Sequence, residues 1–285
     1  TTLQALSTSG SATWDPVFTA FNQMATTEQV SNGVSQTVPV LVGAGSQATA
    51  TVMQNFNDVI DSRTSVKQGL VSKEEFIGNQ EVWLKPLGSW AEQNQVNNVA
   101  GYRANTGGLI LGLDRAISQK TSLGLAFVFA NSNLSSNSAA APSSLNINSY
   151  QAGAYGHHRF TPSTMLNYQA DIGINQNKGS RSISFMGTTA NSSYDSYSSH
   201  LGLGLNHHLQ GNDRFTLIPL IRADYIGVMS NAYTEDGAGP LSLSVNQQNY
   251  SQVLMTTGAK AEYALPNRLK IVGNLTAGYN VINQP

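Results

Sequence analysis

The sequence lacks cysteine and has little charge. Its 285 residues include no Cys, and Asp, Glu, Lys and Arg together make up 11%, against about a quarter in ordinary globular domains. The formal net charge is −1 and no cluster of Lys or Arg occurs, which argues against a nucleic-acid partner. The absence of Cys suits a protein that crosses an oxidising compartment before folding, although many cytosolic proteins also lack Cys.

Long apolar runs are missing too. No stretch approaches the roughly 18 apolar residues of a membrane-spanning helix, and the richest runs, such as Leu217 to Ile221, are soon interrupted. Disorder would require fewer aromatic residues and a larger net charge. A β-barrel in lipid fits the slightly negative mean hydropathy, because alternate residues face hydrocarbon and a polar lumen. Since Thr1 opens no signal peptide, we expect an exported precursor to carry its signal upstream.

The first segment, residues 1–78, has helical texture. Apolar side chains recur at spacings of three and four along one stretch, at Trp14, Val17, Phe18, Phe21 and Met24. A second stretch, from about Ser46 to Arg63, places Val52, Phe56, Val59 and Ile60 on one side. Its roughly 18 residues would span about 27 Å, close to the thickness of a bilayer core. We predict a helical linker segment over 1–78, with one long helix over about 46–63.

From Val82 onward the apolar period changes to two, which is typical of strands. Leu109, Leu111 and Leu113 alternate with smaller or polar residues, and similar patterns recur down the chain. The sequence therefore predicts an all-β, antiparallel outer-membrane barrel. About nine strands are expected, over 82–90, 109–113, 123–129, 150–160, 166–176, 197–209, 215–228, 250–265 and 269–281.

The predicted connections alternate in length. The short ones cover 118–120, 161–163, 211–214 and 266–268. The long ones cover 91–104, 135–146, 180–193 and 233–247. Outer-membrane barrels have this alternation, with short periplasmic turns and long extracellular loops. A soluble β-sandwich has no reason to sort its loops in this way.

Aromatic residues stand near the ends of the predicted strands. We expect a membrane girdle that includes Trp83, Trp90, Tyr155, Phe160, Phe215 and Tyr263. The alternative explanation is ordinary β-propensity, which enriches aromatic residues in any strand.

Several stretches resemble the autotransporter β-domain of type V secretion. The first two are Val82-Trp83-Leu84-Lys85-Pro86-Leu87-Gly88-Ser89-Trp90 and Thr106-Gly107-Gly108-Leu109-Ile110-Leu111-Gly112-Leu113-Asp114. Others follow in order at 122–126, 150–156 and 233–239. Each stretch is a weak signal and their ordered succession is a strong one, covering about Val82 to the end.

The resemblance implies a twelve-stranded barrel in the Gram-negative outer membrane. It also implies that the preceding helix threads the lumen and joins an upstream passenger at the cell surface, and that the outer-membrane assembly machinery inserts the barrel. About nine strands are visible, bacterial single-chain barrels have even numbers, and no terminal aromatic residue follows Asn283-Gln284-Pro285. We therefore expect an incomplete β-domain over 79–285, with about three strands missing at the C-terminus.

Polar residues at the alternate strand positions that face the lumen define the candidate site. Alternation predicts that ten of them face inward: Asp114, Gln151, Asn167, Gln169, Asp171, His200, Arg222, Asp224, Lys260 and Glu262. Charge on that face meets water, whereas Arg or Lys on the lipid face costs about 2–4 kcal/mol at mid-depth. We expect four of these residues, Asp114, Asp171, Arg222 and Asp224, to contact the helix around Asn55 and Asp58. The alternative is that the lumen charges neutralise one another without the helix.

No catalytic, metal or cofactor site is expected. The pairs His157-His158 and His207-His208 lie on strands, where adjacent side chains point to opposite faces. No Gly-x-Ser-x-Gly elbow occurs. Some members of the family cleave their own passenger, and Asn57, Asp58 and Asp61 supply the residue types for this without a motif that fixes the bond.

Three functions are compatible with these patterns: an autotransporter translocator and anchor, a porin-like channel, and a soluble all-β adhesin. The predicted helix separates the first two functions, because a diffusion pore requires an open lumen and a plug helix would close it. Dependence on detergent separates both from the third.

Overall fold

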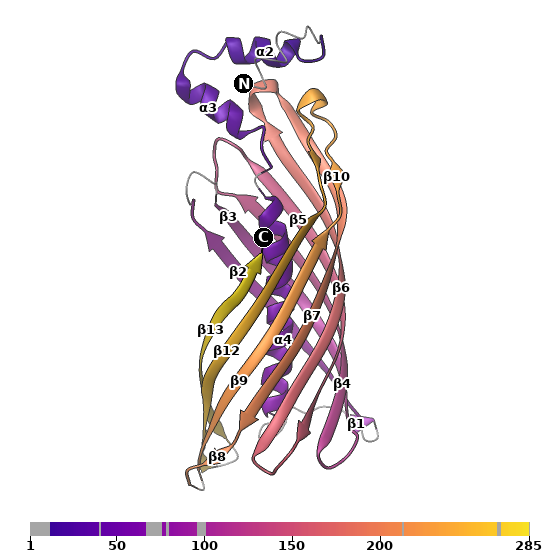
Figure 1. Ribbon diagram of the computed structural model, residues 1–285, viewed down its shortest axis with the longest axis vertical. Coiled ribbons are helices and arrows are strands. Elements are labelled where there is room, and N and C mark those ends of the chain that lie inside the picture. Colours follow the sequence, from indigo (N-terminus) through magenta and orange to yellow (C-terminus); the bar gives the residue numbers. More distant parts are fainter. Residues whose placement is uncertain are drawn as a thin grey trace.

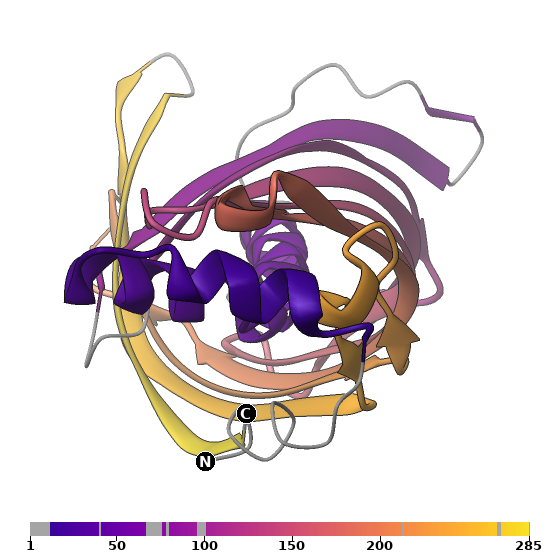
Figure 2. The same ribbon diagram turned by 90° about the horizontal axis from the view of Figure 1, so that it is seen from above.

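A long helix lies inside the curve of an antiparallel sheet (Figures 1 and 2). The computed structural model describes residues 12–39, 41–66, 76–77, 80–95, 101–212, 214–266 and 269–284. The helices it describes are α2 (Asp15–Asn22), α3 (Thr27–Ser35) and α4 (Val42–Val66). None of the helices in these ranges is both long enough and apolar enough to cross a membrane.

Nine long strands form the sheet. They are β2 (Gln80–Gln93), β3 (Tyr102–Ala116), β4 (Thr121–Ser136), β5 (Ser143–Arg159), β6 (Thr164–Ile183), β7 (Thr188–His207), β9 (Phe215–Ser230), β12 (Gln248–Ala264) and β13 (Lys270–Gln284). Each pairs with the next in chain order, β1 (Phe76–Ile77) extends the β2 edge, and β8 (Leu209–Gln210) pairs with β9. A separate ribbon joins β10 (Tyr233–Thr234) to β11 (Ser244–Val245). The nine predicted antiparallel strands are confirmed.

One of the predicted long loops is largely strand, and another is half strand. Strands β6 and β7 stay paired up to Ile183 and Thr188, where the one-turn 3-10 helix η1 (Ser184–Met186) and Gly187, with φ +64°, close the hairpin. The loop predicted over 180–193 is therefore wrong, and β5 already begins within the loop predicted over 135–146. Ser, Asn and Thr are abundant there because these strands leave the apolar band, while backbone pairing still satisfies their peptide groups. We call this the extended end of the sheet and the opposite end the turn end.

The two faces of the sheet differ as alternation predicts. On β7, Leu201, Leu203 and Leu205 are exposed on the outer face, while Gly202 and Gly204 between them are buried against the interior. The same outer face of β6 runs from Leu166 to Ile174, about 27 Å along the strand. At a tilt of about 40° this gives roughly 20 Å of apolar height, near the ~25 Å band of outer-membrane barrels.

The apolar band ends sharply towards the extended end. Phe129 and Tyr150 pair across β4 and β5 with ring centroids 5.3 Å apart. In the next outward row Asn131 donates to Asn148 at 2.8 Å, and further asparagines continue the ladder. An aromatic row followed by amides marks the expected border between hydrocarbon and headgroups.

The smaller helices lie beyond the extended end (Figure 1). Asp15 and Pro16 occupy the first turn of α2. A capping box starts α3: Thr26 Oγ1 accepts from the Gln29 backbone N–H, and the Gln29 side chain accepts from that of Thr26, both at 3.2 Å. Helix α4 runs down the interior of the sheet and exceeds the predicted 46–63 at both ends.

The lipid-facing assignment of the outer face predicts depth-dependent stability. Replacing Ile172 by Arg, inside the apolar band on β6, should lower the free energy of unfolding in phospholipid vesicles by roughly 2–4 kcal/mol. Gln176→Arg, on the same face beyond the aromatic row, is the matched control and should change it by less than about 1 kcal/mol. Equal effects of the two substitutions in urea titrations would contradict the assignment.

Candidate functional site: the contacts of helix α4 with the sheet

Apolar side chains of α4 between Ala44 and Ile60 pack on the inner face of the sheet. Near the turn end Val52, Phe56 and Ile60 form a buried cluster with Trp83 and residues of β2–β5, and Phe56 is fully buried. Met53 and Ala50 pack on β9, and residues 41–48 pack on β3–β5 nearer the extended end. Each fully buried large side chain contributes roughly 1.5–3 kcal/mol relative to exposure.

Glycines on the inner face of the sheet, which we call the wall, make room for large inward side chains. A Cβ added at Gly112 would stand 2.2 Å from the Trp83 ring, and one at Gly202 would stand 2.2 Å from Nη2 of Arg222. Real Cβ atoms do not come so close to heavy atoms, so a side chain at either position would displace the ring or the guanidinium group. Inward glycines on this sheet therefore have a packing role as well as easing curvature.

Arg222 on β9 joins the sheet to α4. Its Nε and Nη2 lie 2.9 and 2.8 Å from the Asp224 carboxylate, and its Nη1 lies 2.8 Å from Oδ1 of Asp61 on α4. Its Nη2 also donates to Oδ1 of Asn57, whose amide donates to Asp224 at 3.4 Å. We call these four residues the Arg222 cluster. Since Arg222 and Asp224 are buried, each charge needs the others to offset its desolvation.

His200 on β7 extends the Arg222 cluster along the wall. Its Nε2 lies 2.9 Å from Asp224 and its Nδ1 lies 2.7 Å from Asp171, to which Gln169 also donates at 2.9 Å. Both ring nitrogens therefore face a carboxylate oxygen, so the His200 ring joins Asp171 to Asp224 along the wall. Asp171, expected to contact the helix, is thus bonded to other wall residues.

Arg63, in the last turn of α4, joins the helix to the sheet at the turn end. Its Nε lies 2.6 Å from Asp114 and its Nη2 lies 3.1 Å from Glu81. Its guanidinium carbon stands 4.6 Å from the centre of the Trp83 ring, within cation–π range. Trp83 donates to the Tyr155 hydroxyl at 2.9 Å, and that hydroxyl donates to Asp114. These five residues form the Arg63 cluster.

The helix residues expected at the contact differ from those observed. Asn55 donates to Ser89 of β2 at 3.1 Å, on a different part of the wall from Arg222. Asp58 lies on an exposed side of α4, whereas Asn57 and Asp61 face Arg222. The helical period explains this, because residues 57 and 61 lie one turn apart on one side and residue 58 is about 100° away.

Two of the six expected girdle residues face the interior. Trp83 and Tyr155 are only 4% and 3% exposed and belong to the Arg63 cluster, so their assignment to the girdle is wrong. The face of the Trp83 ring contacts Arg63, and the Tyr155 hydroxyl donates to Asp114. The other four stand near strand ends, where Trp90 and Phe160 are exposed and Phe215 pairs with Tyr263 across β9 and β12.

A further set of contacts holds the chain before α4 at the extended end. Arg181 of β6 is buried, pairs with Glu235, and donates to the backbone carbonyls of Gln36 and Leu241, the latter at 2.9 Å. We call these residues the Arg181 cluster. Burial, followed by the Glu235 carboxylate, raises the pKa of the nearby Tyr233 to about 12. Tyr233 is thus a neutral phenol at physiological pH.

Helix α2 docks on the same part of the molecule. Val17 packs into a buried cluster with Ile183 and Leu241, and the Phe21 and Phe185 rings lie 4.8 Å apart. The one-turn 3-10 helix η2 (Gly239–Leu241) contributes to this cluster. The strand extensions and the loop after β10 thereby form a seat for the residues that precede α4.

Arg63 and the Arg181 cluster were not anticipated from the sequence. Arg63 follows Phe56 and Ile60 on the apolar side of its helix, and an arginine on such a stripe indicates a buried ionic partner. No comparable pattern precedes Arg181, because its partners Gln36, Glu235 and Leu241 are far away in sequence.

A curled sheet with an apolar outer face and a polar interior closed by a helix defines the class of outer-membrane barrel proteins. The Autotransporter beta-domain family profile matches residues 82–284. The chain belongs to this family, whose β-domains are outer-membrane translocators for passenger domains.

Similar sequences come from surface proteins of Rickettsia. Outer membrane protein A of Rickettsia rickettsii is 28% identical over 219 residues, which cover 72% of this chain and 10% of that protein. Outer membrane protein B of Rickettsia prowazekii is 24% identical over 225 residues, which cover 76% and 13%. The chain thus spans about a tenth of the length of these relatives.

Solved structures agree on the fold. The translocator domain of the autotransporter NalP from Neisseria meningitidis superposes with a TM-score of 0.66 at 15% identity, covering 82% of this chain and 79% of that one. The β-domain of the Bordetella autotransporter BrkA gives 0.51 at 13% identity, covering 71% and 81%.

Removing the Arg222 guanidinium should destabilise the molecule strongly. Arg222→Met removes the guanidinium group from Asp61 and from the buried Asp224, which then relies on His200 and Asn57. Breaking a buried pair in this way costs about 3–5 kcal/mol. Arg103→Met is the control, because its pair with Glu92 has side chains 64% and 51% exposed and is worth about 0–1 kcal/mol. Chemical unfolding in lipid measures both, and a loss below about 1 kcal/mol for Arg222→Met would refute the assigned role.

The Arg181 cluster predicts a second, local effect. Arg181→Gln should free the segment around α2 and α3, because the Gln36 and Leu241 carbonyls lose their shared donor. Limited proteolysis of the folded protein should then cleave within residues 12–39 at least tenfold faster, whereas Lys178→Gln, an exposed position on the same strand, should leave cleavage unchanged. Unchanged cleavage of Arg181→Gln would show that the apolar cluster alone holds this segment.

Proposed function

We propose that this domain supports the export of an upstream passenger to the cell surface and then anchors it, with α4 retained in the lumen as plug and tether. The observation that carries the proposal is the pairing of the C-terminal part of α4 with two separate parts of the wall. Arg63 of the helix binds Asp114 and Glu81 of the wall, and Arg222 of the wall binds Asp61 and Asn57 of the helix.

The direction of α4 supports export towards the extended end. Its first residues pack near the strand extensions, and its last turn reaches the Arg63 cluster beside the short turns. Short turns are periplasmic in outer-membrane barrels, so a chain that precedes α4 lies on the cell-surface side. We assign residues 1–78 to the passenger end and linker, and 79–285 to the β-domain; that boundary falls outside the described residues.

The ion pairs between α4 and the sheet favour a plug over an open channel. A porin lumen is lined by charges that water solvates, whereas here Arg222, Asp224 and Asp114 are buried and bonded to α4. Withdrawing the helix would separate oppositely charged partners on both sides. The apolar outer face likewise disfavours the soluble adhesin, which would bury its leucines.

The partners follow from this role: outer-membrane lipid around the sheet, the barrel assembly machinery during insertion, and the chain's own passenger. We propose no catalytic activity and no cofactor for the domain itself. Its charged side chains bond to one another across a packed interface, and that arrangement suits holding a helix.

Surface exposure of the upstream chain tests the export function. An epitope tag inserted just before Thr1 in the gene's own product should become accessible to external protease on intact cells. Arg103→Gln is the control and should leave accessibility unchanged. A tag that stays protected in protein correctly folded in the outer membrane would contradict export.

Conductance tests the plug. In planar bilayers the purified full-length product of the gene should conduct weakly, and its double variant Arg63→Gln, Arg222→Gln should conduct more, because the helix loses both ionic attachments. High conductance of the unaltered protein would favour the porin-like channel, and failure to enter bilayers would favour the soluble β-protein.

A further inference from the structure

The outer face of the sheet has a hollow of about 740 Å³ on strands β2 to β7. The strand register explains it. Leu125, Ala154, Ala170 and Leu201 stand opposite one another in one outward row, so two alanines lie between two leucines. In the row nearer the turn end, Gly156 stands between Leu123 and Tyr168.

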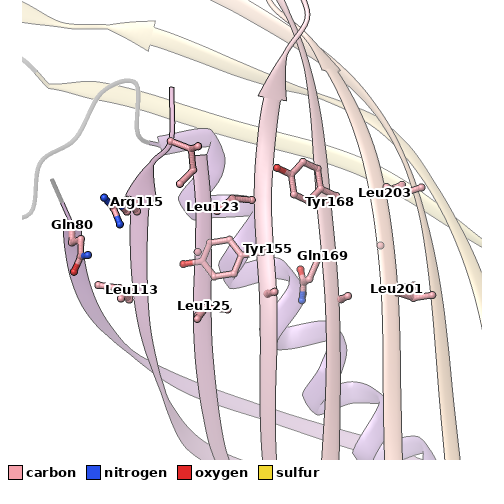
Figure 3. A pocket seen from close by; sticks show the side chains of 15 residues that line it. Gln80, Leu113, Arg115, Leu123, Leu125, Tyr155, Tyr168, Gln169, Leu201 and Leu203 are labelled. Carbon is pink, nitrogen blue, oxygen red and sulfur yellow. The ribbon is translucent and has the colours of Figure 1, made fainter. Parts of the chain in front are cut away.

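Small residues on neighbouring strands leave a depression about two strands wide, or roughly 10 Å. Leu123 and Leu125 border the alanines on one side, and Leu201 and Leu203 on the other (Figure 3). Beyond Leu123 and Leu125 the hollow reaches Leu113 and Arg115 of β3. The alanines cover so little of the backbone that Tyr155, whose side chain faces the interior, also lines the hollow. The volume lies within the range of small-molecule sites, about 300–1,000 Å³.

The hollow continues towards the extended end. A second depression of about 300 Å³ shares Ala170 and Leu201 with the first and adds Ala152 and Ser199. The two together form an elongated groove that crosses the strands obliquely, from Arg115 near the turn end of β3 to Ser199 on β7. An occupant must therefore be long, apolar and narrow enough to lie between leucine walls.

Unpaired positive charge stands at the turn end of this groove. Arg115 lines the hollow next to Leu123. Within the described ranges its side chain makes no hydrogen bond or ion pair. Lys120 follows in the adjacent turn, and its carbonyl accepts from the backbone N–H of Arg159 at 2.8 Å. The carboxylates nearest in the ladder, Glu81 and Asp114, face the interior and bind Arg63.

We propose that this groove binds a phospholipid of the periplasmic leaflet, with an acyl chain over Ala154 and Ala170 and an anionic headgroup at Arg115. The long, apolar shape fits an acyl chain. The cations at one end fit a negatively charged headgroup, because charge-assisted hydrogen bonds to phosphate are stronger than neutral ones. The turn end places that headgroup in the inner leaflet, given the short-turn assignment.

Native mass spectrometry of the detergent-solubilised protein tests the site, with phosphatidylglycerol as the anionic probe and phosphatidylcholine as its zwitterionic counterpart. We expect one phosphatidylglycerol to be retained preferentially. Arg115→Gln should weaken its binding about tenfold, the loss of one charge-assisted contact. Arg103→Gln, at the other end of β3, should leave it unchanged.

Filling the groove tests the acyl site. Ala154→Leu with Ala170→Leu should abolish the preferential phosphatidylglycerol, whereas Ala223→Leu, on the same outward row as Leu203 but outside the hollow, should not. Equal retention of the two lipids by the unaltered protein would overturn the proposal, even if the filled variant failed to fold. So would retention unaffected by Arg115→Gln, or a second copy of the chain bound in place of lipid. Export and conductance do not enter these measurements, so the proposal and the plug function fail independently.

Discussion

A buried guanidinium group that is paired from both sides is the constraint on which the structure depends. Arg222 lies between Asp224 of its own strand and Asp61 of the helix; Arg222 and Asp224 are buried, and the Asp61 side chain is 35% exposed. Removing one partner leaves an uncompensated charge, whose cost exceeds that of most single contacts. The helix and the sheet are therefore coupled, because the buried charges of each have their partners on the other. The Arg63 cluster repeats this arrangement at the turn end with the charges exchanged, the cation on the helix and the acids on the wall.

The packing of the wall follows from the need to enclose a helix. Large inward residues such as Trp83 and Arg222 reach towards α4, and glycines beside them supply the space that these side chains occupy. The outer face follows another rule: leucines, isoleucines and aromatic residues meet lipid, and asparagines begin where the aromatic row ends. One strand carries both patterns, since successive side chains point to opposite faces.

Much of this fold could be predicted from the sequence, because alternation along a strand is a local signal. All ten polar residues assigned to the interior lie on the inward parity, and Leu201 and Leu203 lie outside. The contacts of the helix were harder to predict. Asp58 and Asn57 are neighbours in sequence, and only the rotation of α4 about its axis decides which one contacts Arg222. Trp83 and Tyr155 were assigned to the membrane girdle because they are aromatic and lie near strand ends. Their positions in the alternation along β2 and β5 place them on the inner face instead. The Arg181 cluster depends on three distant segments and left no local pattern.

Hydrogen exchange along α4 in lipid tests most directly whether the helix is held inside the sheet. The account predicts that the amides of residues 48–60 exchange as slowly as those of β6 and β9, and far more slowly than those of the largely exposed α3. It also predicts that Arg63→Gln with Arg222→Gln removes this protection while the strands keep theirs. Exchange of α4 as fast as that of α3 in the unaltered protein would contradict the central claim.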